Sequence, residues 1–157
     1  MRKAVRAIVV KDDQMLVMKR NKFGHEYYTL VGGGIDFGEE PLQSLVREVR
    51  EEASMEINNP RLVYVEQPGD PYGTQYIYLC DYVGGEPKLA ADSIEAEISK
   101  AGQNLYQTMW LPIKDLVTKP FLSETLKQTL MGAFKNGFPE QPIELHSSAE
   151  VRYTDKT

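Results

Sequence analysis

The chain has 157 residues, of which 41% are hydrophobic and 26% charged, and its formal net charge is −5. The length suits one globular domain, and the negative charge gives no global basic field of the kind that binds nucleic acid. A single cysteine excludes an intrachain disulfide and a cysteine-rich metal site. Because no signal peptide or long apolar run is visible, we expect a cytoplasmic protein without a membrane span.

The N-terminal quarter is rich in strand-forming residues. Ala4–Val10 and Gln14–Arg20 are predicted strands, and Lys11–Asp13 between them has the composition of a hairpin turn. Tyr27–Val31 is aromatic and β-branched, so it is a third predicted strand. It runs directly into three glycines, Gly32–Gly34.

An amphipathic helix is predicted after the glycines. It starts near Pro41, since proline is tolerated in a first helical turn. Its apolar positions follow helical spacing and form one expected buried stripe: Leu42, Leu45, Val46, Val49 and Ala53. The helix is expected to end near Ser54, before a turn at Asn58–Pro60.

The middle of the chain alternates strand-like and polar segments. The predicted strands here are Arg61–Gln67, Gln75–Val83 and Leu105–Pro112. Pro68–Gly73 separates the first two, and Gly84–Asn104 is expected to be a polar loop with one helical turn.

The C-terminal part contains a short predicted helix at Ile113–Pro120 and an amphipathic one at Phe121–Gly137, with Ser123 as its cap. Strands dominate, which indicates an α+β fold with a mixed sheet between helices. We expect one domain over residues 1–137. The tail, residues 138–157, is expected either to add an edge strand at Ile143–His146 or to contact a second copy in a homodimer.

Negative charge gathers on one side of the predicted helix. On a helical wheel Glu48, Glu51 and Glu52 fall within roughly 100°. Neighbouring like charges cost roughly 0.2–0.5 kcal/mol each unless a cation lies nearby. Glu52 lies beside the apolar stripe and is expected to be more screened from water than Glu51, which an i,i+4 pair with Arg47 orients.

Clustered carboxylates without histidine or cysteine suit Mg²⁺, Mn²⁺ or Ca²⁺ rather than zinc. Mg²⁺ is usually held by one or two carboxylates together with substrate phosphates. The glycine-rich segment Gly32–Pro41 supports this reading, because glycines let backbone groups approach a metal or a phosphate closely.

This segment and the helix together resemble the Nudix box of the MutT-like hydrolases. The matching positions are Gly33, Glu39, Arg47, Glu48, Val49, Glu51, Glu52 and Met55. Ser54 departs from the pattern, because the family has glycine there. The box covers residues 33–55, and the resemblance in strand order reaches to about Gly137.

The resemblance implies the Nudix fold, an α/β/α sandwich around a mixed sheet. It also implies hydrolysis of a nucleoside diphosphate linked to another moiety, such as a nucleoside triphosphate, ADP-ribose or a dinucleoside polyphosphate, with Mg²⁺ or Mn²⁺. Carried over by position, the implied metal ligands are Glu48, Glu51, Glu52 and the backbone carbonyl of Gly33. Arg47 matches a residue that orients the glutamates, and Glu39 matches a structural or outer acid.

Further residues are candidates for the substrate side. Gly32 and Gly34 offer backbone groups, and the family often uses one more acid from a downstream loop, for which Glu95 and Glu97 are candidates. Tyr72 stands at about the distance from the box at which the family has a tyrosine associated with dinucleoside polyphosphates.

Ser54 leaves a second function open. A Nudix-fold module that senses a nucleotide without cleaving it is the alternative, although three repelling carboxylates are not needed for sensing. A third idea, a charged helix that serves only for interaction, requires no affinity for divalent metal.

Overall fold

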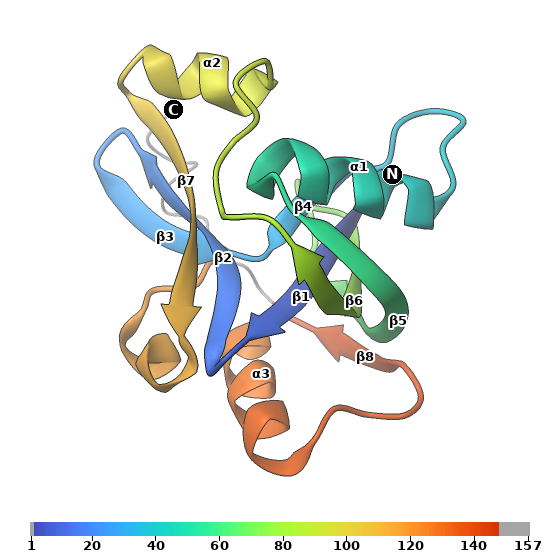
Figure 1. Ribbon diagram of the computed structural model, residues 1–157. Helices are drawn as coiled ribbons and strands as arrows, with labels where there is room; N and C mark the ends of the chain where they lie inside the picture. The colour runs from blue at the N-terminus through green and yellow to red at the C-terminus, as the bar shows by residue number, and fades with distance from the viewer. Residues whose placement is uncertain (1, 148–157) are drawn as a thin grey trace.

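The computed structural model describes residues 2–147, and Figure 1 shows its strands between helices α1 and α3. The elements, in chain order, are β1 (Lys3–Lys11), β2 (Gln14–Lys22), β3 (His25–Thr29), β4 (Val31–Gly34), α1 (Pro41–Ala53), β5 (Glu56–Gln67), β6 (Thr74–Gly84), α2 (Ile94–Lys100), β7 (Asn104–Pro112), the 3₁₀ helix η1 (Ile113–Thr118), α3 (Glu124–Asn136) and β8 (Ile143–His146).

The described strands form one mixed sheet. Its main path is β3-β2-β1-β6-β5-β8, while β4 pairs with β1 and β7 pairs with β2. The pairs β1–β6 and β5–β8 are parallel, and the remaining pairs are antiparallel. The predicted α+β fold with a central mixed sheet is therefore confirmed.

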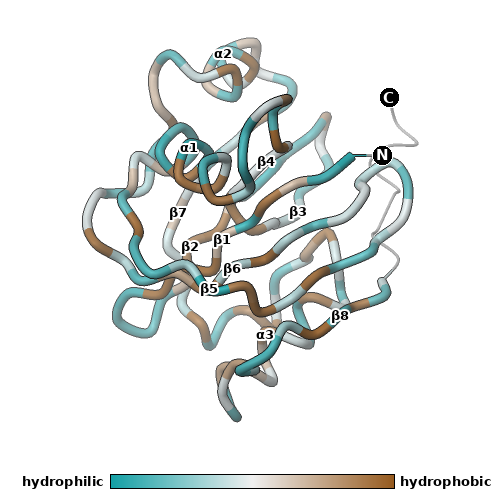
Figure 2. Tube along the Cα trace, turned by 90° about the vertical axis from the view of Figure 1, so that its right-hand side faces the viewer, coloured by the Kyte–Doolittle hydropathy of each residue, from teal (hydrophilic) through white to brown (hydrophobic). Residues whose placement is uncertain are grey.

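The core lies on both faces of the sheet. Alternate residues of β1 point to opposite faces: Val9 packs in the cluster that contains Leu45 of α1, and Ile8 packs in the cluster that contains Leu130 of α3. Figure 2 shows hydrophobic residues along β1, β2 and β6 in the middle of the molecule and hydrophilic residues along many outer loops. The two helices thus cover the sheet from opposite sides.

Helix α1 begins and ends where the sequence predicts. Pro41 is in its first turn, and Gln43 Oε1 accepts a hydrogen bond from the Glu40 backbone N–H at 2.8 Å. The helix ends at Ser54, which is left-handed with φ 54° and ψ 41°. The buried stripe is narrower than predicted, because Leu42 and Val46 are 46% and 36% exposed.

The region after α1 differs from the prediction. Instead of a turn at Asn58–Pro60, β5 continues through these residues, and its register with β6 shifts there. Asn59 takes a left-handed φ of 48°, so the local turn signal is absorbed as an irregularity within one long strand.

The C-terminal elements agree with expectation. Ser123 caps α3 by accepting a hydrogen bond from the Leu126 N–H at 3.0 Å. β8 lies at the sheet edge beside β5, as the edge-strand alternative predicts, and residues 148–157 lie outside the described part. Within residues 2–147, no helix combines the length and hydrophobicity needed to cross a membrane.

Candidate functional site

A cavity of about 390 Å³ opens beside the N-terminus of β1, the glycine run, α1, α2 and β7. Charged side chains of both signs line it. The acidic ones are Glu48, Glu52 and Glu95, and the basic ones are Arg2, Arg6, Arg20 and Lys22. A cavity of this composition suits a ligand that carries both metal cations and anionic groups.

The glycine run of β4 packs directly against two carboxylates of α1. The Gly32 N–H donates to Glu52 Oε1 at 3.0 Å. A Cβ built on Gly33 would lie 2.6 Å from Glu48 Cδ, and one built on Gly32 would lie 1.9 Å from the Val5 carbonyl oxygen. At Gly32 the close approach to backbone requires glycine, whereas a Cβ at Gly33 would take the space of the Glu48 carboxylate.

Burial makes the negative charges of these glutamates costly. Glu52 is 5% exposed, and burial raises its pKa to about 8 although Arg6 and the Gly32 N–H oppose the shift. Burial likewise raises the pKa of Glu48, against the positive charge of Arg47. Each carboxylate is therefore in an environment that favours either a proton or a bound cation.

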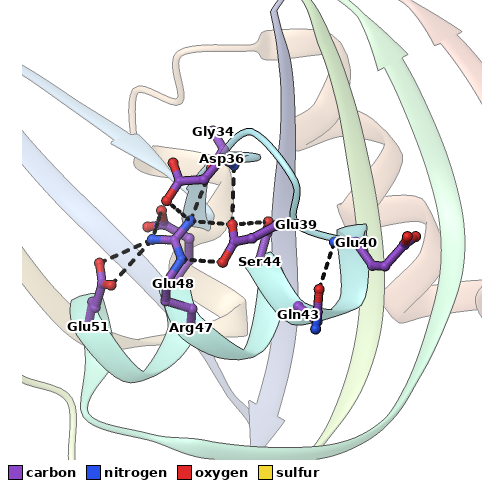
Figure 3. Close-up of polar contacts among 9 residues, drawn as sticks. All are labelled: Gly34, Asp36, Glu39, Glu40, Gln43, Ser44, Arg47, Glu48 and Glu51. Carbon is purple, nitrogen blue, oxygen red and sulfur yellow. Dashed lines mark hydrogen bonds and ion pairs between the residues drawn. The ribbon is translucent and has the colours of Figure 1, made fainter.

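Arg47 connects three acidic residues of the box, Glu39, Glu48 and Glu51 (Figure 3). Its guanidinium donates two bonds to Glu39, at 2.8 and 2.9 Å, and one to Glu48 at 2.9 Å. It also reaches Glu51 at 3.3 Å and the Gly34 carbonyl at 3.4 Å. The predicted Arg47–Glu51 pair is present. The same guanidinium also holds the carboxylates of Glu39 and Glu48 in place.

Glu39 lies behind this arginine. Besides Arg47, its carboxylate accepts hydrogen bonds from Ser44 Oγ and from the Asp36 backbone N–H. The hydrogen bond from Arg47 is the main reason why the pKa of Glu39 falls to about 2. Glu39 does not line the cavity, and it contacts Arg47 rather than the cavity itself.

The two arginines Arg6 and Arg20 donate hydrogen bonds to uncharged oxygen acceptors. Half-buried Arg6 donates to Gln75 Oε1 at 3.0 Å and to the Leu30 carbonyl at 3.1 Å, and desolvation lowers its pKa. Arg20 donates to the Leu105 carbonyl and to the Tyr27 hydroxyl, both at 3.2 Å, and also to the Asn104 side chain.

The Tyr106 ring lies under the Arg20 guanidinium, 3.6 Å from ring centroid to Cζ. Stacking and the three hydrogen bonds fix the guanidinium in one place without a carboxylate among these partners. The guanidinium of Arg20 thus lies at the cavity wall in a fixed orientation, so it can meet an anionic ligand without moving.

Several predicted residues are brought to this cavity and others are not. Gly32, Gly33, Gly34, Glu48, Glu52 and Tyr72 line it. Glu51 is turned toward Arg47, with 40% of its side chain exposed, which confirms that it is more open than Glu52. Glu97 is exposed and pairs with Lys100 at 3.5 Å, whereas Glu95, two residues earlier, lines the cavity.

The four basic residues of the cavity were not predicted from the sequence. One signal was available, since Arg6 is a charged residue inside an otherwise apolar strand. An arginine within such an apolar strand is uncommon unless it has a specific partner or ligand. Arg2, Arg20 and Lys22 carry no comparable signal, because basic residues at strand ends are ordinary.

The oxygen donors fit a hard divalent cation. Carboxylates and backbone oxygens, without nitrogen or sulfur, are the donor set of Mg²⁺ and Mn²⁺. Among residues 2–147, no three His, Cys, Asp or Glu side chains already converge as a metal cluster. Glu48 and Glu52 share the cavity and pack on the glycine backbone, while Glu51 is held by Arg47.

Comparison with known proteins agrees with this geometry. A family model described as NUDIX domain matches residues 1–131. An ADP-ribose pyrophosphatase of Methanocaldococcus jannaschii is 33% identical over 60% of this chain and 59% of its own length. The NAD-capped RNA hydrolase NudC of Pectobacterium atrosepticum is 28% identical over 74% of this chain and 44% of its own length. The chain therefore spans roughly half the length of these relatives.

Solved structures share the fold. An ADP-ribose pyrophosphatase from Streptococcus suis superposes with a TM-score of 0.62 at 19% identity, covering 92% of this chain and 98% of the other. A MutT NUDIX hydrolase from Burkholderia pseudomallei gives a TM-score of 0.63 at 21% identity, covering 83% and 95%.

Proposed function

Because this chain belongs to the NUDIX family, we propose that it hydrolyses the pyrophosphate bond of a nucleoside diphosphate linked to another moiety. One observation carries the proposal: a single cavity holds buried carboxylates from α1 beside the glycine backbone and also arginines from β1 and β2. Carboxylates bind a divalent cation, and arginines bind phosphate oxygens.

We infer that Mg²⁺ or Mn²⁺ is the cofactor. Glu48 and Glu52, with the Gly33 carbonyl, would hold it, and Glu51 would join them on release from Arg47. When bound, such an ion polarises phosphoryl oxygens and lowers the pKa of a coordinated water. The positive charge also removes the penalty of two buried carboxylates.

The chain's own residues have separate tasks in this proposal. Arg6 and Arg20 bind and orient the phosphates, and their fixed guanidinium groups need no reorganisation. Glu95 is the acid outside the box that lines the cavity, so its carboxylate is placed to accept a proton from the attacking water. Arg47 and Glu39 keep the α1 glutamates in position.

We propose that the substrate belongs to the group that the relatives' names suggest. ADP-ribose and NAD both contain adenosine joined to a second ribose through a pyrophosphate, and the cavity offers Tyr27, Tyr72 and Tyr106 beside its charged groups. Aromatic rings of this kind stack on nucleobases. Nucleoside triphosphates and dinucleoside polyphosphates meet the same chemical requirement and belong in the test.

The test is product release from a substrate panel with Mg²⁺ and with Mn²⁺. The panel holds ADP-ribose, NADH, NAD-capped RNA, nucleotide sugars, diadenosine polyphosphates and canonical and oxidised nucleoside triphosphates. Glu52→Gln runs beside the native protein, with Glu56→Gln as a matched control on an exposed glutamate just past α1. Turnover that disappears only in Glu52→Gln supports the proposal.

Nucleotide binding without any product, measured by calorimetry, would instead favour the sensor. Equal turnover in Glu52→Gln and native protein would contradict the assignment of the metal site.

A further inference from the structure

The last turn of α1 depends on chain segments outside the helix. The final four carbonyls of a helix have no partner within it. Here all four accept hydrogen bonds, and the pairs are Arg50 O with Ser54 N–H at 3.0 Å, Glu51 O with Ala90 N–H at 2.8 Å, Glu52 O with the Thr108 hydroxyl, and Ala53 O with Lys88 N–H at 3.3 Å. Residues 88 and 90 therefore complete the end of the helix that carries the glutamates.

Ser54 adds a bond that glycine cannot make. Its hydroxyl donates to the Lys88 carbonyl at 2.8 Å, while the Lys88 N–H donates to Ala53 O. Lys88 is thus held by two hydrogen bonds running in opposite directions. The chain also passes very close to this point, since a Cβ on Gly85 would lie 2.3 Å from the Ser54 carbonyl oxygen.

A series of hydrogen bonds leads from this point to α2. Ala90 donates to Glu51 O and, through its own carbonyl, accepts from both the N–H and the hydroxyl of Ser93. Ser93 caps α2 by accepting from the Ala96 N–H at 3.1 Å. Glu95 lies in this first turn and lines the cavity. Figure 1 shows the segment between β6 and α2 running beside α1.

Serine at position 54 carries a conformational cost. Its left-handed backbone is one that glycine adopts freely and that costs other residues roughly 1 kcal/mol. The Nudix pattern has glycine here, so the hydroxyl is what this chain gains from the exchange. Among residues 2–147, the only hydrogen bond of the Ser54 hydroxyl goes to the Lys88 carbonyl.

We propose that Ser54 is a positioning residue, whose hydroxyl fastens residues 86–93 to the end of α1 and thereby holds Glu95 in the cavity with Glu48 and Glu52. The proposal rests on the hydrolase function proposed above. It explains why a strained serine stands where glycine would end the helix at lower cost.

Three variants separate the hydroxyl from the backbone conformation. Ser54→Gly removes the hydroxyl and relieves the left-handed strain, whereas Ser54→Ala removes the hydroxyl and keeps the strain. We expect both to lower kcat/KM by roughly fivefold, the factor of one ordinary hydrogen bond, although Ser54→Gly is the more stable of the two. Ser54→Asn tolerates the left-handed region and retains a donor, so it restores activity at least partly.

Two further measurements tie the effect to Glu95. In a Glu95→Gln background, Ser54→Gly should cost little more, because both changes act on the same group. By hydrogen exchange, the amides of Lys88 and Ala90 should be protected in the native protein and exchange faster in both Ser54→Gly and Ser54→Ala. Thr118→Ala is the control, since it removes a similar hydroxyl-to-carbonyl bond in η1, outside the cavity lining.

The outcomes distinguish this inference from the proposed function. Native turnover that is unchanged in Ser54→Gly and Ser54→Ala overturns the inference and leaves the hydrolase intact. Reduced turnover only in Ser54→Ala assigns Ser54 to helix termination alone, which also overturns it. Absence of native turnover on every substrate defeats the function, and hydrogen exchange then decides whether Ser54 fastens residues 86–93.

Discussion

The carboxylate of Glu48 occupies the space that a side chain on Gly33 would need. A Cβ on Gly33 would lie 2.6 Å from both Cδ and Oε2 of Glu48. Gly33 has no positive φ, and the clashing group is the far end of a flexible side chain. We expect Gly33→Ala to fold normally but to displace the Glu48 carboxylate, lowering kcat/KM by about 10–100-fold, as changes beside metal ligands do.

Gly32→Ala is the matched control for this pair. Its Cβ would meet the Val5 backbone oxygen at 1.9 Å, which cannot move without shifting β1. We expect a clear loss of melting temperature in Gly32→Ala and almost none in Gly33→Ala. Full activity in Gly33→Ala would show that the position of Glu48 does not matter for the reaction.

Much of the fold was predictable because its signals are local. The helical spacing of Leu45, Val49 and Ala53 predicted α1. Pro41 predicted where the helix begins, and Ser54 marked where it ends. The spacing of Glu48 and Glu52 on one face required only helical geometry. The burial of Glu52 was predicted from the neighbouring apolar stripe of the same helix, whereas the burial of Glu48 was not predicted.

The remaining part of the site depends on tertiary packing. Arg6 and Arg20 come from two different strands, and only the pairing of β1 with β4 and of β2 with β7 brings them beside α1. The choice between Glu95 and Glu97 depended on which face of α2 meets the cavity, and a loop sequence does not reveal it. Such relations join residues far apart in the chain, so no local pattern encodes them.

The raised pKa of Glu52 makes the free energy of unfolding of the metal-free protein depend on pH. Burial raises its folded pKa from 4.5 to about 8, so the folded state keeps a proton that the unfolded state releases. Between these values the folded state binds more protons, and the free energy of unfolding therefore falls as pH rises. We expect the melting temperature of Glu52→Gln to exceed that of native protein at pH 8 by about 3 °C or more, with the difference shrinking toward pH 5.

Scanning calorimetry in a chelator at several pH values measures this difference. Glu56 is an exposed glutamate paired with Arg50. The melting temperature of Glu56→Gln should therefore change with pH in parallel with that of the native protein. A constant gap between Glu52→Gln and native protein across the range would mean that Glu52 is not the titrating group.

Metal binding should reverse this penalty. Adding Mg²⁺ or Mn²⁺ at pH 7 should raise the melting temperature of the native protein, since a ligand bound only to the folded state stabilises it. Binding should also release protons, because carboxylates must be ionised to bind the ion. Calorimetric titration in two buffers of different ionisation enthalpy measures the release, and Glu48→Gln and Glu52→Gln should lose both effects. Retention of both effects in these variants would place the metal elsewhere.

We expect that lysine cannot replace Arg47 in holding the carboxylates of Glu39, Glu48 and Glu51 together. Its fork makes two bonds to Glu39 while a third nitrogen reaches Glu48 and Glu51. A lysine ammonium keeps the charge but cannot hold these partners together. We expect Arg47→Lys to weaken metal affinity and kcat/KM by about 10–100-fold. Arg50→Lys, one turn nearer the helix end and paired only with Glu56 among the described contacts, should be close to native in both measurements.

Arg20 should act in substrate binding rather than in the metal site. Its guanidinium is fixed over Tyr106 and lines the same cavity as Glu48, but it lies on β2, away from the box. A hydrogen bond to a charged phosphate is worth about 1.5–3 kcal/mol, which corresponds to roughly 10–100-fold in affinity. We therefore expect Arg20→Gln to raise KM by that factor while Mg²⁺ affinity stays native.

Steady-state kinetics on the best panel substrate, with metal titration beside it, separates these effects. Arg61→Gln removes an arginine of β5 that bonds to the Pro139 carbonyl outside the cavity lining, so it controls for loss of one positive charge. If Arg20→Gln lowers metal affinity as strongly as it raises KM, then Arg20 supports the fold of the site and not the phosphates. If KM rises alone, the charge that β2 brings to the cavity is part of substrate recognition.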